Sequence, residues 1–385
     1  MKLLIPVAAG LEQTVKRQLF ALGYEKAPAF NGRIEVEGEW SDIARLNLFL
    51  RSGERVLIKL AEFPAATFDE LFDGVYNIAW EEWLETDSRI LMDGKSVSSA
   101  LAAIKAAGGV AKKAIIRRLS DKKRSARQTF SESGARSIVG VSLYKDVATV
   151  TLDTSGDGLH KRGYRSLAYS APLKETFAAA LIDNTFYTLE NAENKPFADP
   201  FCGSGTLPIE AAIKALNIAP GIRRSFDFEQ WKIADKTALP RAREEAEDVR
   251  IRNRALKIYG SDVNPEAISI AKYHAKQAGV SEYIRFSVCD MRQFKSEDSH
   301  GVLISNPPYG ERLSDTKSVQ ALMRDFGKIF RALPDWSAYV LTSLPEFERY
   351  FGKSADKKKK LFNANLPCGF YSYLGKPPKR ENPSP

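Results

Sequence analysis

The segment Asn306-Pro307-Pro308-Tyr309 follows the apolar run at 301–304, which is typical of a buried strand. Proline fixes its own backbone torsion and biases the preceding residue toward extended geometry, so these residues are expected to form a rigid strap. The side-chain oxygen of Asn306 and a main-chain carbonyl can accept two hydrogen bonds from an –NH2 group, and Tyr309 offers a face for stacking. The strap predicts a clamp for a planar substrate with an exocyclic amine, with all four residues as catalytic candidates. The alternative is a rigid turn with a surface tyrosine.

A glycine-containing loop within 199–212 predicts a ligand site at the start of a helix. Asp199 ends an expected strand, Gly203 and Gly205 allow a tight turn and close approach of a ligand, and the helix behind them opens with free N–H groups. The loop is not a dinucleotide fingerprint, because the third glycine would fall at Pro208, and no Walker-type Gly-Lys-Ser/Thr follows. The cofactor-binding candidates in this loop are Asp199, Cys202, Gly203, Gly205 and Thr206.

Acidic residues also end the next two expected strands. Asp262 can accept hydrogen bonds from both hydroxyls of a ribose, although a charged insert at 235–256 separates it from the glycine loop by more than the usual ~20 residues. Asp290 can accept from an exocyclic amino group, with Met291 against an adenine face. Each acid alone is compatible with a cap or a turn, but three acids at successive strand ends would face one crevice. The candidates here are Asp262, Asn264, Asp290 and Met291.

The elements that position these residues change character along the chain. From about residue 178, strands and helices alternate regularly, which predicts an α/β fold with a mostly parallel sheet and a ligand crevice at the carboxyl ends of its strands. The segments 359–365 and 369–375 are expected to close this sheet as a terminal hairpin. The first 160 residues mix short strands and helices, which favours an α+β module. The Gly- and Ser-rich stretch 153–175 is the expected joint.

Composition excludes several classes of protein. A chain of 385 residues with 44% hydrophobic and 27% charged residues predicts two or three globular domains, and no apolar run approaches the ~20 residues of a membrane span. The N-terminus has the length of a signal-peptide core, but its continuation as an amphipathic pattern favours a strand followed by a helix. The three cysteines show no metal-binding spacing, so we expect no metal and a cytoplasmic protein.

The formal net charge of +9 is concentrated in one segment. Residues 105–127 carry nine basic residues against the single acid Asp121. On a helix, Lys113, Arg117 and Arg124 would share a face, which favours binding to the phosphates of a nucleic acid over a merely solvated surface. The RNA-binding candidates are Lys112, Lys113, Arg117, Arg118 and Arg124.

Four segments carry a family resemblance: "LDTSGDGLHKRGYR", "APLKETFAAALI", "DPFCGSGTLPIEAA" and "SNPPYGERL". They resemble the bacterial 23S rRNA guanine-N2 methyltransferases, whose members are often labelled N6-adenine-specific DNA methylases. The resemblance spans nearly the whole chain. It implies an N-terminal RNA-binding module at 1–164, with a THUMP domain at about 44–155, and a Rossmann-like class I methyltransferase domain at 165–385.

The resemblance also implies roles for the site residues. Gly203 and Gly205 would contact the methionine part of S-adenosyl-L-methionine, Asp262 its ribose, and Asp290 with Met291 its adenine. The strap residues would hold the target base, and the basic segment lies where a THUMP domain would place its RNA-contacting helix. The insert before Asp262 departs from a minimal methyltransferase domain.

The implied reaction needs no metal and no covalent nucleophile, because the sulfonium methyl group is already activated. Its expected product is a methylated guanine N2 in structured RNA, most simply ribosomal RNA. N6-adenine methylation of DNA or RNA and N5 methylation of a protein glutamine use a similar strap and remain open. So does an RNA-binding protein without catalysis, although the intact strap and acids argue against it.

Overall fold

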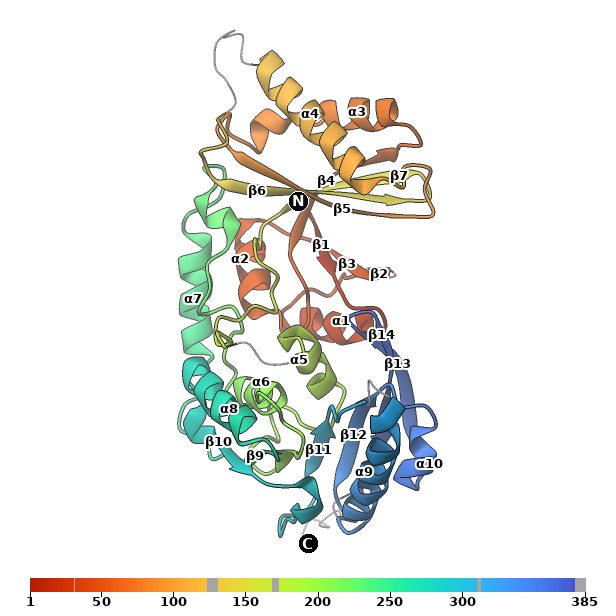
Figure 1. The fold of residues 1–385 in the computed structure, drawn as a ribbon. Helices are drawn as coiled ribbons and strands as arrows, with labels where there is room; N and C mark the ends of the chain where they lie inside the picture. Colours follow the sequence, from red (N-terminus) through yellow and green to blue (C-terminus); the bar gives the residue numbers. More distant parts are fainter. Residues whose placement is uncertain (31, 123–130, 168–172, 310–312, 378–385) are drawn as a thin grey trace, which may run out of the picture.

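The structure is a computed structural model that describes residues 1–30, 32–122, 131–167, 173–309 and 313–377. Within these residues the chain forms two seven-stranded sheets. Figure 1 shows them at opposite ends of an elongated molecule, with helix α4 over one end and helices α8 and α9 around the other. No helix among the described residues is both long and apolar enough to cross a bilayer.

The first sheet has the strand order β2-β3-β1-β4-β7-β6-β5 and is antiparallel except for the β5–β6 pair. The prediction of an initial strand and helix is confirmed, because Leu3 and Ile5 of the first strand are fully buried in the core. The strands are β1 (Lys2–Pro6), β2 (Ala29–Phe30), β3 (Arg33–Glu37), β4 (Leu57–Pro64), β5 (Arg89–Val97), β6 (Arg136–Tyr144) and β7 (Val147–Asp153). Its helices are α1 (Glu12–Ala21), α2 (Trp40–Phe49), α3 (Phe68–Tyr76), the 3-10 turn η1 (Trp80–Glu82) and α4 (Ile104–Lys122).

The second sheet has the order β10-β9-β8-β11-β12-β14-β13. Strands β8 to β12 pair in parallel and β14 pairs antiparallel with both its neighbours, as the predicted Rossmann-like sheet with a terminal hairpin requires. Its strands are β8 (Phe197–Asp199), β9 (Ile258–Asp262), β10 (Ile284–Val288), β11 (Val302–Ser305), β12 (Ser337–Thr342), β13 (Lys357–Asn363) and β14 (Leu366–Tyr373). Its helices are α5 (Glu175–Asp183), α6 (Thr206–Ala215), α7 (Ala238–Asp248), α8 (Pro265–Ala278), α9 (Leu313–Arg331) and α10 (Phe347–Phe351), with 3-10 turns η2 (Asp227–Gln230), η3 (Ser281–Tyr283) and η4 (Met291–Gln293).

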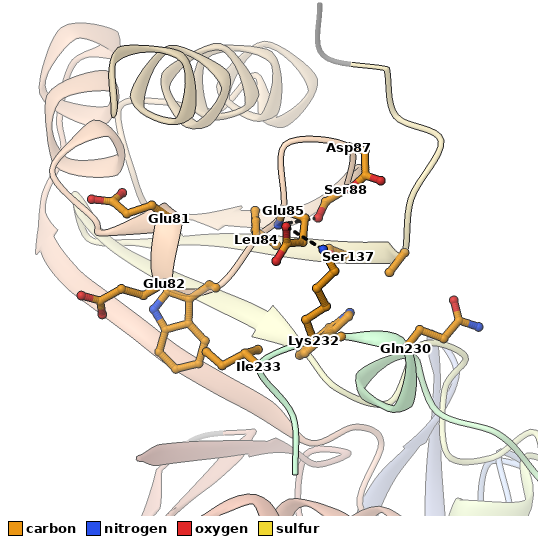
Figure 2. A pocket seen from close by; sticks show the side chains of 13 residues that line it. Glu81, Glu82, Leu84, Glu85, Asp87, Ser88, Ser137, Gln230, Lys232 and Ile233 are labelled. Carbon is orange, nitrogen blue, oxygen red and sulfur yellow. Dashed lines mark hydrogen bonds and ion pairs between the residues drawn. The ribbon is translucent and has the colours of Figure 1, made fainter. Parts of the chain in front are cut away.

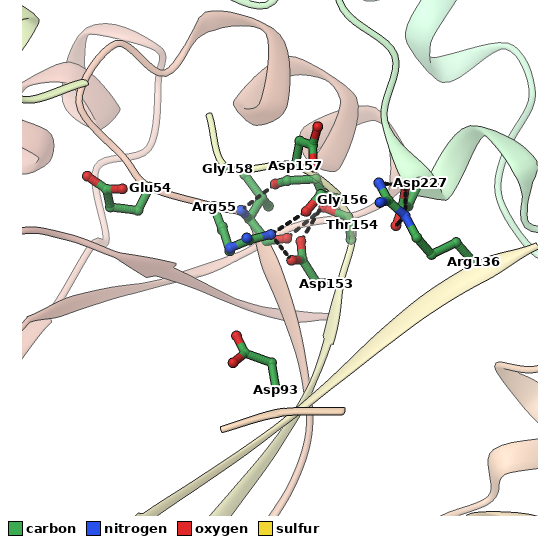
Figure 3. A network of polar contacts seen from close by, with 12 residues as sticks. Glu54, Arg55, Asp93, Arg136, Asp153, Thr154, Gly156, Asp157, Gly158 and Asp227 are labelled. Carbon is green, nitrogen blue, oxygen red and sulfur yellow. Dashed lines mark hydrogen bonds and ion pairs between the residues drawn. The ribbon is translucent and has the colours of Figure 1, made fainter. Parts of the chain in front are cut away.

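The insert before Asp262 runs between the two ends of the molecule. Helix α7 packs against α2, and Glu245 accepts two hydrogen bonds from the Arg45 guanidinium, at 2.8 and 2.7 Å. Beside it, Asp227 accepts from Nε and Nη2 of Arg136, each at 2.8 Å (Figure 3). Residues 227–256, which include the insert, therefore form a strut that ties the second sheet to the first half of the molecule.

The residues just before the insert make a second contact, at the edge of the first sheet. The Trp231 indole Nε1 donates to the Arg136 carbonyl at 2.9 Å, and Lys232 pairs with Glu85 at 3.1 Å (Figure 2). A small cavity of about 130 Å³ remains between the insert and this edge. The lysine of the exposed pair is 77% accessible, so screening by solvent limits its contribution, and Arg136 carries more of the attachment.

The joint after β7 is held by buried polar contacts. Asn47 Nδ2 donates to Thr154 Oγ1 at 2.8 Å, and the Ser155 hydroxyl donates to Asn47 Oδ1 at 2.6 Å. Arg55 Nη1 binds both the Asp153 carboxylate and the Gly156 carbonyl (Figure 3). These contacts fix the direction in which the chain enters the second half of the molecule.

Candidate active site

The carboxyl ends of β8, β9 and β11 meet at one edge of the second sheet, as the parallel order predicts. The Ser305 hydroxyl at the end of β11 donates to Asp199 Oδ1 at 3.0 Å. The Gly203 N–H donates to Asp262 Oδ2 at 3.0 Å. The structure thus joins the glycine loop, two of the strand-end acids and the start of the strap in one place.

The glycine loop adopts a backbone that side chains would obstruct. Gly203 and Gly205 have φ values of 51° and 84°, in the left-handed region that glycine adopts most readily. A Cβ at Gly205 would lie 2.9 Å from the Ala271 Cβ of α8. Glycine therefore allows the loop to pass closely over α8 before α6 begins at Thr206.

The side chains at the end of this loop are oriented by the fold. Thr206 is buried, and its Oγ1 accepts from Arg165 Nη2 at 2.6 Å, while the same nitrogen donates to the Leu173 carbonyl at 2.8 Å. The Cys202 thiol is 7% exposed, and burial raises its pKa, so it remains protonated. Arg165 ends the segment "LDTSGDGLHKRGYR", but its role at the loop was missed by the sequence reasoning, because it lies 41 residues before Thr206 and nothing in that segment names its partner.

Asp199 is the most perturbed acid of the site. Burial raises its pKa to about 7, against the opposing effect of hydrogen bonds from the Phe201 N–H and the Ser305 hydroxyl, and the nearby Asp262 charge raises it further. A carboxyl group with this pKa is partly protonated near neutrality. Asp199 is thus suited to a buried, structural position beneath the cofactor loop.

Asp262 bridges its own strand end and the loop. Its Oδ1 accepts from the Asn264 N–H at 2.9 Å, while its Oδ2 takes the Gly203 bond. Asn264 is the N-cap of α8, since its Oδ1 accepts from the Glu266 N–H at 2.9 Å and Pro265 follows at the first helical position. The cap is Asn264, for which cofactor binding was predicted, and cofactor binding by Asp262 and Asn264 stays a prediction.

Asp290 has a partner that was not predicted. Its carboxylate accepts from the Arg292 N–H at 2.8 Å and from Arg292 Nη1 at 2.9 Å, and Arg292 Nε reaches Asp325 of α9 at 2.9 Å. Met291 is 2% exposed and packs in the smaller core cluster with Leu303. The adenine contacts assigned to Asp290 and Met291 stay predictions, with Met291 covered by protein atoms in this conformation.

The strap residues contact one another directly. The Tyr309 hydroxyl donates to Asn306 Oδ1, the atom predicted to accept from a substrate amine. Pro307 is buried and Pro308 exposed, so the strap is anchored at its middle. Tyr309 lies beside Asn363 and Cys368 of the terminal hairpin, and burial raises its pKa. The acceptor and the stacking platform thus lie together, with the hairpin as an unpredicted neighbour.

Acidic side chains neutralise more of the positive charge on the basic helix α4 than the sequence suggested. Lys113 and Arg117 are exposed on α4 as predicted, but Arg118 binds Glu81 through two hydrogen bonds of 3.0 and 2.8 Å and lowers the pKa of that acid to about 2. Lys112 pairs with Glu132, and Arg117 with Asp121 at 2.9 Å. Arg124 lies outside the described residues. Acids from distant segments therefore neutralise part of the charge that is local in the sequence.

Comparisons with known proteins decide the family. A family model of the RMKL-like methyltransferase domain matches residues 162–372, one of the RlmL ferredoxin-like domain matches 2–57, and one of the THUMP domain matches 65–153. YpsC of Bacillus subtilis (strain 168), named as a candidate RNA methyltransferase, is 41% identical over 367 residues that cover 95% of this chain and 94% of that protein. The chain belongs to the RMKL-like methyltransferase family.

Solved structures share the whole architecture. SMU.472, a candidate methyltransferase crystallised with SAH, superposes with a TM-score of 0.90 at 40% identity and covers 98% of this chain and 99% of its own. A predicted N6-adenine-specific DNA methylase from Listeria monocytogenes gives a TM-score of 0.90 at 44% identity, covering 97% and 96%. The ribosomal RNA large subunit methyltransferase K/L of Psychromonas ingrahamii is 35% identical over 376 residues, but this chain spans about half of that protein's length.

This family member is an S-adenosylmethionine-dependent RNA methyltransferase with a THUMP domain. Its residues fit the cofactor, because the Gly205 position leaves no room for a side chain between the loop and α8, and two acceptor carboxylates lie beside the loop. Among the described residues, no group of three or more potential metal ligands is found.

Proposed function

We propose that this enzyme transfers a methyl group to the exocyclic N2 of a guanine in 23S rRNA. The observation that carries the proposal is the position of Asn306 and Tyr309 at the end of β11, beside the strand end that the glycine loop follows. The THUMP domain and the named rRNA relative support RNA as the carrier of that base. We further propose that residues 165–385 form the catalytic unit and residues 1–164 the RNA-binding module.

In this mechanism the strap orients the amine. Asn306 Oδ1 and a strap carbonyl accept the two hydrogens of guanine N2, so that its lone pair points away from both toward the methyl donor. S-adenosylmethionine supplies an electrophilic methyl carbon when it is bound. With the cofactor bound, the amine nitrogen would form the new bond to this carbon as the carbon–sulfur bond breaks, S-adenosylhomocysteine would leave as the neutral thioether, and the extra proton of the methylated amine would pass to solvent water.

The base must leave its stack before it can reach the strap. Enzymes that act on a base offset the cost of unstacking by stacking the flipped base on a new surface, and Tyr309 offers one. In the structure its hydroxyl occupies Asn306 Oδ1, so the base amine exchanges with that hydroxyl as it enters. The role of Asn306 is thus testable separately from cofactor binding.

Adenine N6 presents the same –NH2 group to the strap, and the Listeria neighbour carries that activity in its name. A direct test incubates the full-length enzyme with methyl-labelled S-adenosylmethionine and, separately, deproteinised 23S rRNA, 16S rRNA, tRNA and duplex DNA. We expect label in N2-methylguanosine from 23S rRNA only. Label in N6-methyladenine, or in DNA, would overturn the proposal and favour the adenine alternative.

A further inference from the structure

The terminal hairpin borders the strap. Strand β13 runs in the same direction as β12, because both pair antiparallel with β14. Its last residue, Asn363, therefore lies at the same edge of the sheet as Ser305, and Tyr309 packs beside it. A two-residue turn at 364–365 follows, so the tip of the hairpin stands next to the proposed base site.

This tip exposes apolar side chains next to unpaired charge. Phe362 is 42% exposed and Leu366 43%, and the Lys360 ammonium lies 5.9 Å from the centre of the Phe362 ring. Lys358 is engaged, with Glu348 at 3.5 Å and the Tyr371 ring at 4.6 Å. Lys357 and Lys360, in contrast, form no ion pair with any acid in the described part of the chain.

The first half of the molecule contacts the other face of the hairpin. A Cβ at Gly10, just before α1, would lie 3.2 Å from both the Leu361 side chain and the Lys360 carbonyl, so the hairpin touches the segment that leads into α1. Lys359 is half-buried on that face, where burial and then the charge of Arg17 on α1 lower its pKa, and the charge of Glu12 raises it. Because successive side chains of a strand point to opposite faces, Lys360 and Phe362 lie on the face that the first half leaves exposed.

We propose that the hairpin tip binds the single-stranded RNA that flanks the target base, with an unpaired base stacked on Phe362 and a phosphate held by Lys360. This inference rests on the proposed function, because base flipping leaves the neighbouring nucleotides without a stacking partner at this edge. Aromatic faces combined with lysines are the surface that single-stranded nucleic acids recognise. Edge lysines that prevent strand addition would explain the charge, but not the exposed phenylalanine and leucine at the turn.

The test compares Phe362→Ala and Phe362→Trp in the full-length enzyme. Binding of a short fluorescein-labelled single-stranded RNA of mixed sequence is followed by anisotropy, and S-adenosylmethionine affinity and thermal stability are measured in parallel. Phe362→Ala is expected to weaken RNA binding about 5- to 150-fold, the range for loss of one base–aromatic stack, and Phe362→Trp to restore it. Lys360→Gln is expected to reduce the slope of log affinity against log salt by roughly 0.7.

The matched control is Phe30→Ala. Phe30 is 47% exposed on β2, and the Arg33 guanidinium carbon lies 5.4 Å from its ring centre. This variant therefore also removes an exposed phenylalanine beside a cation, but on a strand of the first sheet. Unchanged RNA affinity in Phe362→Ala would overturn the proposal, as would an equal loss in Phe30→Ala. A loss that tryptophan does not restore would assign the tip to folding instead, and a smaller solution mass of Phe362→Ala than of the wild-type protein by light scattering would assign it to self-association.

These readouts separate the two proposals. RNA binding is measured without turnover, so the role of the hairpin fails or stands whichever nucleoside is methylated. Conversely, a wild-type enzyme that methylates adenine would sink the guanine assignment and leave the anisotropy result intact.

Discussion

At the residue scale, the proposed specificity for an amine depends on Asn306. Its side-chain oxygen is held by the Tyr309 hydroxyl, within a strap whose second residue, Pro307, is buried. Because the strap is anchored by proline geometry rather than by Asn306 itself, replacing this side chain should leave the backbone in place.

We expect Asn306→Ala to lower kcat for RNA methylation by about 10²- to 10³-fold, the usual effect of removing one oriented polar group that acts on the reacting atoms. The affinity for S-adenosylmethionine, measured by calorimetry, should stay unchanged, because the hydrogen bonds of Asn306 and of the glycine loop go to different partners in the described structure. The control is Asn194→Ala, an exposed asparagine just before β8. Turnover by Asn306→Ala at the wild-type rate would contradict the role of the strap.

Asp199 predicts a pH dependence of stability. Its folded pKa of about 7 lies above the ordinary value of 3.8, so the folded state binds the proton more tightly than the unfolded chain does. The resulting stabilisation is complete below pH 4 and is lost as the pH rises through 7, to a total of roughly 4 kcal/mol.

Asp199→Asn removes this titration. Relative to the variant, the wild-type protein should lose stability between pH 4 and pH 8 in urea unfolding. Asp153, whose pKa burial raises to about 6, titrates in both proteins and cancels from the difference. Parallel stability curves for the two proteins would show that Asp199 ionises normally in the fold.

At the element scale, features that depend on local sequence patterns could be predicted, whereas side-chain partners from distant parts of the chain could not. The strand–loop–helix around Gly203, the helix after Asp262 and the terminal hairpin could be predicted because each depends on neighbours in the sequence. Arg165 at Thr206 and Arg292 at Asp290 could not be assigned, since a lone arginine has no pattern that names its partner.

The side-chain partners of the insert and of the residues just before it could not be predicted from the sequence either. The charge of the insert was visible in the sequence, but its function as a strut depends on the pairing of Asp227 with Arg136 across 91 residues and of Glu245 with Arg45 across 200. Asp227 is 9% exposed, so loss of its carboxylate leaves a partly covered guanidinium without a partner.

Asp227→Ala should therefore reduce the free energy of unfolding by about 1.5–3 kcal/mol, the usual contribution of hydrogen bonds to a charged group. Lys232→Ala, which removes the exposed pair with Glu85, is the control and should change it by less than about 1 kcal/mol. Urea unfolding of both variants makes the comparison. Equal effects would mean that Asp227 does not anchor the insert.

The basic helix α4 gives the second prediction at this scale. Replacing Lys113 and Arg117 by glutamine should weaken RNA binding. The slope of log affinity against log salt should become less steep by roughly 0.7–0.9 for each phosphate that is no longer neutralised. The control changes Lys272 and Lys276, exposed residues of α8 with the same four-residue spacing. An unchanged slope in the α4 variant would make this face a solvated surface only.

At the scale of the whole molecule, helix α4 of the THUMP domain lies at one end of an elongated protein and the second sheet lies toward the other (Figure 1). The predicted α/β class and the N-terminal α+β module are confirmed. The sequence did not reveal that β1 pairs with both β3 and β4, which merges the ferredoxin-like and THUMP segments into one sheet. Such pairing between distant strands follows from the global packing and has no local signature.

Because the ferredoxin-like and THUMP segments share one sheet, we expect the molecule to hold the proposed RNA-binding module in a fixed position relative to the proposed catalytic unit. The first sheet, the strut with α7 and the second sheet follow one another along its length, and side-chain pairs join the strut to the first half. An RNA that meets both the α4 face and the strap must reach from the first sheet to the second, which favours a folded RNA over a short single strand.

The most direct test of the central claim is nucleoside mass spectrometry of 23S rRNA from cells that lack this gene, with complementation by the wild-type or the Asn306→Ala protein. The account predicts that N2-methylguanosine decreases by one modified site in the deletion, returns with the wild-type protein and stays absent with Asn306→Ala. An unchanged level of N2-methylguanosine, with loss of N6-methyladenosine in its place, would contradict it.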